Sequence, residues 1–338
     1  MQGFDLIGDV HGCGNTLRRL LELMGYSRQS GALKLEAWRH PAGRQVIFVG
    51  DILDRGPRVR QALHDVRAMI EAGTAHMVLG NHEYNALAYS TLNMAGQPLR
   101  SHSVRHQRVI QETLDQFEPW PNEWQDFLNW FMTLPLALDL ETLRVVHACW
   151  DNALMPRFFE QYPDGKMTPE FLQASAIVGT DAFKIIDRCT RGTWLRLPEG
   201  QTQKSDDGFI RDRFRTSYWV EQPRTWGDVL FQPDRLSPEA EATLISEQDQ
   251  RHLCYYPPED KPLFFGHYWC QGFPSVIRSN LACLDYSAVK YGRLVAYRFD
   301  GEARLSAEKF VWVEVQKDEY PPLEELRAEM TAEDIQKI

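Results

Sequence analysis

The sequence lacks the features that mark membrane and secreted proteins. None of its apolar runs approaches the length needed to span a bilayer. The N-terminus carries Asp5 and Asp9, where a signal peptide would have a basic region followed by an apolar stretch. These absences predict a cytoplasmic protein without a membrane partner.

Cysteine is scarce and basic charge is in deficit. The six cysteines are dispersed and form no CxxC pair, which argues against a zinc knuckle and against a secreted disulfide framework. The formal net charge is -10, so the chain as a whole repels polyanions, and we expect no nucleic-acid polymer as a partner. A phosphate-bearing substrate would have to be attracted locally.

Five short apolar runs are each followed by residues that can bind a metal. They are residues 4–7 before Asp9 and His11, 46–49 before Asp51, 77–79 before Asn81, 143–146 before His147, and 263–265 before His267. Runs this short, rich in β-branched and aromatic residues, are typical of buried strands.

Helical patterns separate the first three runs. Apolar residues recur at helical spacing from Leu17 to Met24, and again in the stretch that Pro57 opens and that continues to Ile70. The βαβαβ order predicts an α/β fold. Since ligands bind beyond the carboxyl ends of the strands in such sheets, we expect the polar residues to converge on one edge.

Each of these polar residues has a simpler explanation when taken alone. An Asp after Gly is usually a turn or capping residue, and a His near a strand end is usually part of the core or the surface. Five successive coincidences favour a functional site, and they involve four of the ten histidines when His82, next to Asn81, is counted.

Three motifs carry a family resemblance. GDVHG at 8–12, GDILDRG at 50–56 and GNHE at 80–83 resemble the ordered signature motifs of calcineurin-like metallophosphoesterases, in the phosphoprotein phosphatase-like branch. Residues 281–300 are similar to the closing strands of symmetrical dinucleoside tetraphosphatases, and the branch also contains bacterial serine/threonine protein phosphatases. The resemblance covers about residues 1–90, 143–150 and 263–300.

The resemblance implies a more detailed fold than the apolar and helical patterns predict by themselves. It implies an α/β protein with two facing mixed β-sheets flanked by helices, a four-layer sandwich with a large insertion. We expect one domain over residues 1–317, with a helical insertion at about 94–140 and a lid-like insertion at about 151–262. Residues 318–338 would form an acidic C-terminal helix or tail.

The resemblance also implies a binuclear metal centre. Asp9 and His11 would bind the first ion, Asp51 would bridge, and Asn81, His147 and His267 would bind the second. Oxygen and imidazole donors suit Mn²⁺, Fe or Zn²⁺ better than Ca²⁺ or Cu(I). We expect two divalent ions, with Mn²⁺ as the first choice and Fe or Zn²⁺ as alternatives.

Three further residues receive catalytic roles from the same motifs. His82 would be the general acid, Asp54 would orient its ring, and Arg55 would grip a phosphate oxygen through its planar guanidinium. Alternatively, Asp54 caps the helix that opens at Pro57, and Arg55 is a solvated loop cation.

Four arginines of the insertion are candidates for substrate binding. Arg211, Arg213 and Arg215 stand at alternate positions, so they could line one face of a strand and meet a distal phosphate. Alternatively, they form a solvated sheet edge, and we favour this second interpretation. Arg191 is a second candidate phosphate clamp.

The expected reaction is hydrolysis of a phosphate ester by attack of a metal-bridged hydroxide. A phosphomonoesterase that acts on small molecules or phosphoproteins is the first choice, because GNHE matches the protein phosphatase form. A dinucleoside polyphosphate hydrolase is the alternative, supported by Gly12-Cys13 and the closing strands. A third hypothesis, an inactive phosphate-recognising scaffold, fits poorly with a complete set of ligands and acid.

Overall fold

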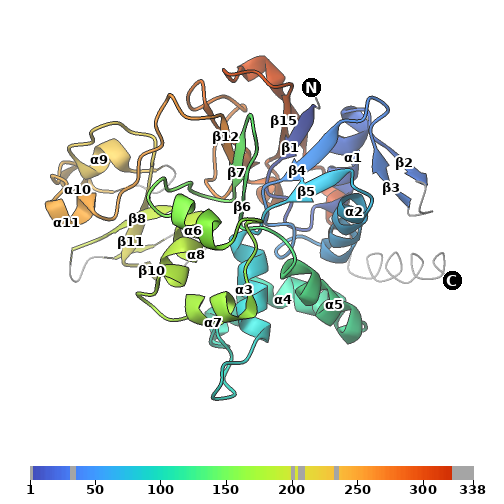
Figure 1. Ribbon diagram of the computed structural model, residues 1–338, viewed down its shortest axis with the longest axis horizontal. Helices are drawn as coiled ribbons and strands as arrows, with labels where there is room; N and C mark the ends of the chain where they lie inside the picture. The colour runs from blue at the N-terminus through green and yellow to red at the C-terminus, as the bar shows by residue number, and fades with distance from the viewer. Residues whose placement is uncertain (1–2, 31–35, 199–201, 205–209, 232–235, 322–338) are drawn as a thin grey trace.

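Two mixed β-sheets lie at the centre of the molecule and carry helices on their outer sides (Figure 1). The structure, a computed structural model, describes residues 3–30, 36–198, 202–204, 210–231 and 236–321. The predicted α/β class with two facing mixed sheets is confirmed.

The first sheet contains the predicted βαβαβ unit. Its strands are β1 (Phe4–Ile7), β4 (Gln45–Phe48), β5 (Ala75–Met77), β14 (Asp285–Tyr286), β15 (Arg293–Phe299) and β16 (Phe310–Glu314). β1, β4 and β5 are parallel, whereas β15 runs antiparallel to β1. β5 lies two residues earlier than the predicted run at 77–79, because the Leu79 N–H bonds the Pro135 carbonyl instead of continuing the ladder with β4.

The second sheet has four strands in the order β13-β12-β7-β6. They are β6 (Ala137–Asp139), β7 (Arg144–Val146), β12 (Leu263–Phe265) and β13 (Leu281–Cys283). β7, β12 and β13 are parallel, and β6 runs antiparallel to β7.

A layer of apolar side chains fills the space between the two sheets. The Phe264 ring of the second sheet lies 5.1 Å from the Tyr297 ring and 5.7 Å from the Phe299 ring of the first. Leu6 and Ile47 belong to the same buried cluster. Both faces of the strands are therefore buried, which explains why they appear in the sequence as continuous apolar runs.

Helices cover the outer faces of both sheets. α1 (Gly14–Leu23) and α2 (Val59–Glu71) pack on the first sheet through Leu17, Leu20 and Leu63. α3 (Asn81–Ser90) begins at the end of β5, while α6 (Met155–Gln161) and α8 (Asp181–Arg191) lie beside the second sheet (Figure 1). These layers place the carboxyl ends of β1, β4, β7 and β12 together.

The helical prediction for residues 94–140 is correct only in part. α4 (Val104–Phe117) and α5 (Pro121–Phe131) are helices, and Phe127 and Phe131 are buried as a core-facing aromatic stripe should be. Residues 137–139 form the edge strand β6 instead, because their backbone pairs with β7. The hairpin of β2 (Ser27–Ser30) and β3 (Glu36–Arg39) was not predicted.

Residues 151–262 hold several short elements. Besides α6 and α8 they are α7 (Pro169–Ser175), α9 (Trp226–Val229), α10 (Pro238–Glu241), α11 (Glu247–Gln250), β8 (Thr193–Arg196), β9 (Gln203–Lys204), β10 (Ile210–Arg211) and β11 (Arg213–Thr216). Leu195, Phe214 and Trp226 form a small hydrophobic cluster of their own. The predicted tail lies outside the described residues from position 322 onward. Within the described ranges, no helix is long and apolar enough to cross a membrane.

A short turn near the C-terminus fastens to the start of α1. Glu319, in the 3-10 turn η3 (Lys317–Glu319), is fully buried and accepts hydrogen bonds from the N–H groups of Asn15 (3.2 Å) and Thr16 (2.6 Å). A carboxylate there satisfies donors that the first helical turn leaves unpaired. The Arg58 guanidinium lies 3.9 Å from it. Because α1 directly follows the loop at 8–13, this contact also supports that loop.

We expect Glu319→Ala to lower the free energy of unfolding by about 3 kcal/mol, because the buried N–H groups would lose their acceptor and Arg58 a nearby carboxylate. Asp318→Ala is the matched control. Its carboxylate is 61% exposed and pairs with Arg19, so its loss should cost about 0.5 kcal/mol or less. Urea unfolding of both variants measures the difference, and equal losses would contradict the anchoring role.

Candidate metal centre

The predicted ligands meet where the carboxyl ends of the parallel strands of the two sheets come together. Asp9 follows β1, Asp51 follows β4, Asn81 opens α3 after β5, His147 follows β7, and His267 follows β12. The two sheets are linked at this point by the contact between the His147 Nδ1, after β7, and the Val49 carbonyl, after β4, at 2.8 Å. Convergence on one edge therefore occurs as the strand-end pattern predicts.

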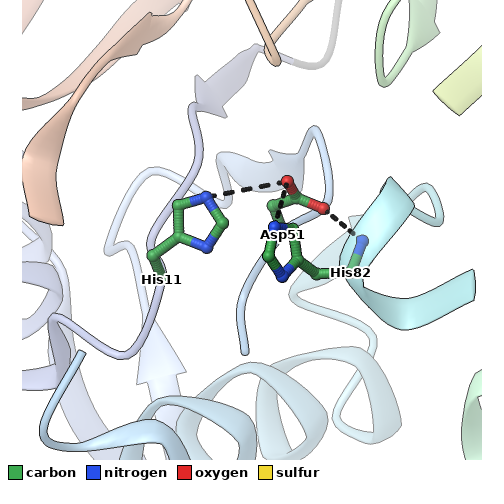
Figure 2. A group of neighbouring side chains, drawn as sticks. All are labelled: His11, Asp51 and His82. Carbon is green, nitrogen blue, oxygen red and sulfur yellow. Dashed lines mark hydrogen bonds and ion pairs between the residues drawn. The ribbon is translucent and has the colours of Figure 1, made fainter. Parts of the chain in front are cut away.

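The carboxylate of Asp51 belongs to two groups of potential ligands. One group is Asp51, His11 and His82, and the other is Asp51, His147 and His267; within each, the ligand atoms lie within 4.8 Å of one another. Figure 2 shows the rings of His11 and His82 turned toward this carboxylate. A carboxylate shared by two groups is placed to bridge two ions.

Asp9 and Asn81 lie beside these groups. An oxygen of Asp9 accepts from the His267 N–H at 3.2 Å. The Asn81 Oδ1 is 3.1 Å from the Nε2 of His147. The structure thus brings together all six residues predicted as ligands, and it adds His82 to the first group. Their roles as ligands remain predictions.

The backbone around the centre is held in an unfavourable conformation. His11, Asp51 and His267 have φ values of 43°, 54° and 62°, in the left-handed region that non-glycine residues rarely adopt. Each such residue costs about 1–3 kcal/mol, so surrounding contacts must enforce it. Glu83 of α3 supplies such contacts, since it accepts from the N–H groups of Asp51 (2.9 Å) and Ile52 (2.8 Å).

Two glycines allow the carboxylates to approach the neighbouring strand ends. A Cβ atom on Gly80 would lie 2.2 Å from the Asp51 Oδ1, and one on Gly266 would lie 2.0 Å from the Asp9 Oδ1. Any larger residue would push these carboxylates out of position. The glycines of the motifs therefore serve close approach.

Backbone carbonyls orient two of the imidazole rings. The Nδ1 of His11 lies 3.0 Å from the Leu53 carbonyl, and the Nδ1 of His147 lies 2.8 Å from the Val49 carbonyl. Since a carbonyl can only accept, each Nδ1 carries the proton. The Nε2 atoms then face the Asp51 Oδ2 at 3.6 and 3.3 Å. This arrangement is typical of metal-binding histidines.

Two of the histidines are kept neutral. Burial, together with Arg55, lowers the pKa of His11 well below its usual range. Burial and Arg215 lower the pKa of His267 in the same way. Neutral imidazole is the form that binds a metal ion.

His147 and Asp51 stabilise each other's charged forms. Although burial opposes the charged ring, Asp51 raises the pKa of His147 to about 10. Burial also opposes the ionised carboxylate, yet His147 and His82 hold the pKa of Asp51 well below its usual range. A divalent cation would take over this compensation from the proton of His147.

One acidic residue of the centre was missed by the sequence analysis. The backbone of Gly8 approaches that of Leu284, since a Cβ on Gly8 would lie 2.0 Å from the Leu284 carbonyl, and the carboxylate of the next residue, Asp285, interacts electrostatically with Asp9. Burial raises the pKa of Asp9 well above its usual range, and Asp285 adds to the rise. Asp285 follows the strand at 281–283, so the strand-end pattern could have found it.

These residues fit divalent metal ions. Asp9, Asp51 and Asp285 bring three buried carboxylates into one region together with neutral imidazoles. The Asp285 Oδ2 is buried and has no hydrogen-bond partner among the residues that the structure describes. Several buried carboxylate oxygens close together, one of them without a hydrogen-bond donor, are stabilised by a nearby positive charge. The oxygen and imidazole ligands present suit Mn²⁺, Fe or Zn²⁺.

His82 stands in a chain of hydrogen bonds. Its Nδ1 is 2.6 Å from the Asp54 Oδ2, and Asp54 is bonded in turn to the buried hydroxyl of Thr113 on α4. The Nε2 of His82 lies 3.1 Å from the Arg55 Nη2. The alternative that Asp54 caps α2 is wrong, since that helix begins at Val59 without a side-chain cap. Thr113 was not predicted, because nothing in its local sequence links it to residue 54.

Arg191, Arg213 and Arg215, three of the arginines predicted to bind substrate, have different hydrogen-bond and ion-pair partners. Arg191 ends α8 and donates to the Asn85 Oδ1 at 3.2 Å, one helical turn along α3 from Asn81. Arg215 donates to the His267 carbonyl at 2.9 Å. Arg213 is 43% exposed and pairs with the neighbouring Asp212.

Arg211 is the last residue of β10. The structure therefore divides the alternate arginines, placing Arg215 beside the metal centre and Arg213 at a solvent-facing pair. Their roles in substrate binding remain proposals.

Comparison with known proteins gives a family match. The profile of calcineurin-like phosphoesterases matches residues 4–181. An asymmetrical bis(5'-nucleosyl)-tetraphosphatase PrpE of Oceanobacillus iheyensis is 29% identical over 203 residues, which is 59% of this chain and 73% of that protein. The corresponding protein of Halalkalibacterium halodurans is 43% identical over 79 residues, 23% of this chain. That match spans only 30% of the relative's length.

Among solved structures, a protein serine/threonine phosphatase from Saccharomyces cerevisiae matches with a TM-score of 0.45 and 13% identity. The match covers 95% of this chain and 81% of that one. A likeness this distant says nothing about activity.

We expect Asp51→Asn to lose affinity for both metal ions and His11→Ala to lose mainly one, because only a bridging ligand contributes to both coordination shells. Asp54→Asn is the control, since this buried carboxylate of the same loop bonds His82 and Thr113 instead. The number of metal ions bound per chain in each purified variant tests the bridging role. Two full equivalents retained by Asp51→Asn would overturn the bridging role.

Proposed function

This chain belongs to the calcineurin-like phosphoesterase family, and we propose that it hydrolyses phosphate monoesters of small molecules or phosphoproteins. The reaction takes place at the centre built around Asp51, with Asp9, His11, Asn81, His147 and His267 as the other ligands. Two divalent ions held there, Mn²⁺ in our proposal, supply positive charge to the phosphoryl oxygens and lower the pKa of a water molecule.

Two side chains act on the substrate directly: Arg55 binds the phosphoryl group, and His82 supplies a proton. Arg55 binds a phosphoryl oxygen through its guanidinium and holds the phosphorus in line for attack by water. Arg55 can only donate to the His82 Nε2, so this nitrogen takes up a proton once Arg55 has turned to the phosphoryl group. His82 then gives that proton to the leaving oxygen as the bond to phosphorus breaks. Asp54 and Thr113 keep the ring of His82 in place, as a carboxylate does for other catalytic imidazoles.

The contact between His82 and Asp54 carries this proposal. The Nδ1 of His82 is bonded to Asp54, and its Nε2 lies 3.9 Å from the Asp51 Oδ2 within the first ligand group. An imidazole is thus held at the metal centre by a carboxylate, and in our proposal it serves as the acid and not as a ligand. A scaffold that only binds phosphate would not require such a donor, which favours an enzyme.

The segment at 151–262 forms part of the proposed substrate site. It contributes Arg191, which reaches α3, and Arg215, which contacts the last ligand residue. We propose that this segment is an insertion in a single domain spanning residues 1–317, and that it acts as a wall over the metal centre.

We expect His82→Ala to lower turnover on an alkyl phosphate by about 10²- to 10⁴-fold while the metal content is unchanged, since a positioned general acid is worth that much. The loss should shrink for p-nitrophenyl phosphate, whose leaving group hardly needs a proton. Kinetics on the two substrates measure the difference.

His64→Ala is the control for this experiment. His64 is also an imidazole paired with a carboxylate, Glu123, at 2.5 Å, but it lies on α2 outside the centre. Its replacement should leave both activities near the wild-type level. Equal losses on the two substrates in His82→Ala would mean that His82 does not act as an acid.

Dinucleoside polyphosphates are a second candidate substrate class. The relatives from Oceanobacillus and Halalkalibacterium are tetraphosphatases of this class by name. The Gly12-Cys13 pair and the closing strands at 281–300 support the same class in this chain.

A substrate comparison distinguishes the two classes. If the chain is foremost a monoesterase, kcat/KM for phosphopeptides and p-nitrophenyl phosphate should exceed that for a dinucleoside tetraphosphate by at least about tenfold, a difference of 1.4 kcal/mol in transition-state binding. The opposite ranking would establish the second class. Assays with Mn²⁺, Zn²⁺ and Mg²⁺ separately show whether the ranking depends on the metal.

A further inference from the structure

The chain passes from the second sheet to the first beside the metal centre. β13 belongs to the second sheet, and β14, which follows after one residue, belongs to the first. Asp285 is the first residue of β14, and its carbonyl accepts from the Cys270 N–H at 3.0 Å. Cys270 follows His267 by three residues, so the backbone of Asp285 is fastened to the loop that carries a predicted ligand.

Only one oxygen of the Asp285 carboxylate has a hydrogen-bond donor. The residue is 2% exposed, and its Oδ1 accepts from the Ser287 N–H at 2.9 Å, which fixes the direction of the carboxylate. The Oδ2 has no hydrogen-bond partner within the described ranges of the chain. A buried carboxylate oxygen without a donor is unfavourable, and a bound cation can compensate it.

The charges around Asp285 do not compensate it once the centre is loaded. Burial is the main cause of the raised pKa of Asp9, and Asp285 adds more to that rise than Asp51 does. Burial also raises the pKa of Asp285, against the opposing charges of Arg55 and His147. In the proposed function Arg55 turns to the substrate and His147 binds metal as a neutral ring. Neither then offsets the charge of Asp285.

The ligand set predicted from the sequence is short of negative charge. Two divalent ions bring four positive charges, whereas Asp9 and Asp51 are the two carboxylates among the predicted ligands. The other predicted ligands are an amide and imidazoles, which bind in neutral form. A third carboxylate beside Asp9 would offset part of the excess positive charge.

We propose that Asp285 is a further metal-binding residue, and that its Oδ2 binds the ion that Asp9 and His11 hold. This inference rests on the ligands of the proposed function. The choice of ion follows from the contact between the backbones of Gly8 and Leu284, because Asp9 and Asp285 are the residues that directly follow them.

Two other roles are open to an acidic residue at this position. It could hold Arg55 in place for the substrate, since the two charges interact. It could also shape the turn through its bond to the Ser287 N–H. The first role leaves metal affinity independent of Asp285. The second is fulfilled by any side chain that keeps the bond to Ser287.

The variant Asp285→Asn separates these roles, because an amide keeps the size of the side chain and an oxygen for the Ser287 N–H but carries no charge. Calorimetric titration of the metal-free protein with Mn²⁺ measures both binding steps. We expect one step to weaken roughly tenfold or more and the other by less than about threefold. Asp65→Asn is the matched control, since this buried carboxylate of α2 pairs with Arg18, and both steps should stay unchanged.

Two double variants identify the ion. Because His11→Ala should retain mainly the second ion, adding Asp285→Asn to it should change the remaining affinity by less than about twofold. His267→Ala should retain mainly the first ion, so adding Asp285→Asn there should still weaken binding roughly tenfold or more.

Stability gives a readout that a structural role would not produce. Without metal, Asp285→Asn removes a buried charge beside Asp9, so the variant should resist urea at least as well as the wild type. At a fixed excess of Mn²⁺ the order should reverse, because the wild type binds the ion more tightly. Asp285→Ser, whose hydroxyl can also accept from the Ser287 N–H, should repeat both results and replaces Asp285→Asn if that variant does not fold.

Three results would overturn the inference. They are two unchanged binding steps in Asp285→Asn, a tenfold weakening of the ion that remains in His11→Ala, and a lower resistance to urea both with and without Mn²⁺. A failure of the proposed function looks different. In that case the wild-type protein hydrolyses no phosphoester of the substrate comparison, although Mn²⁺ binding still depends on Asp285.

Discussion

The hydrogen bonds from backbone N–H groups to Glu83 are the interaction on which the metal centre depends. Glu83 accepts from Gly80, Asp51 and Ile52, and it thereby joins the start of α3 to the turn after β4. This turn is strained, because Asp51 has a left-handed backbone. Without the carboxylate of Glu83, the N–H groups of Asp51 and Ile52 would lose their acceptor, and fewer contacts would hold the strained turn that carries the side chain shared by both ligand groups.

The proposed acid and the proposed ligands are held in place by different contacts. The ligand rings of His11 and His147 are oriented by the backbone carbonyls of Leu53 and Val49, which belong to the strand-end loops. His82 is oriented by a side-chain series that ends on a different element, at Thr113 of α4. In our proposal, a change in the helical layer would therefore disturb proton transfer while metal binding persists.

Local patterns were sufficient for the parallel core of the fold. The apolar runs before Asp9, Asp51, His147 and His267 are strands, and the periodic stretches between the first three are α1 and α2. The patterns were insufficient where pairing with a distant segment decides the structure. Residues 137–139 are a strand only because β7 lies next to them, and β5 ends early because the Leu79 N–H turns to the Pro135 carbonyl.

The sequence by itself determined which residues stand at the strand ends, because the order Asp, Asp, Asn, His, His and the flanking glycines are local features of the chain. Only the tertiary structure decided which of them share the Asp51 carboxylate and which other residues join them. Asp285 meets Asp9, Thr113 meets Asp54 and Lys290 meets Trp269 through packing between elements remote in sequence. The strand-end pattern can mark Asp285 as a candidate, but no periodicity or motif encodes which distant residue each of these side chains meets, since that depends on how two sheets and their helical layers come together.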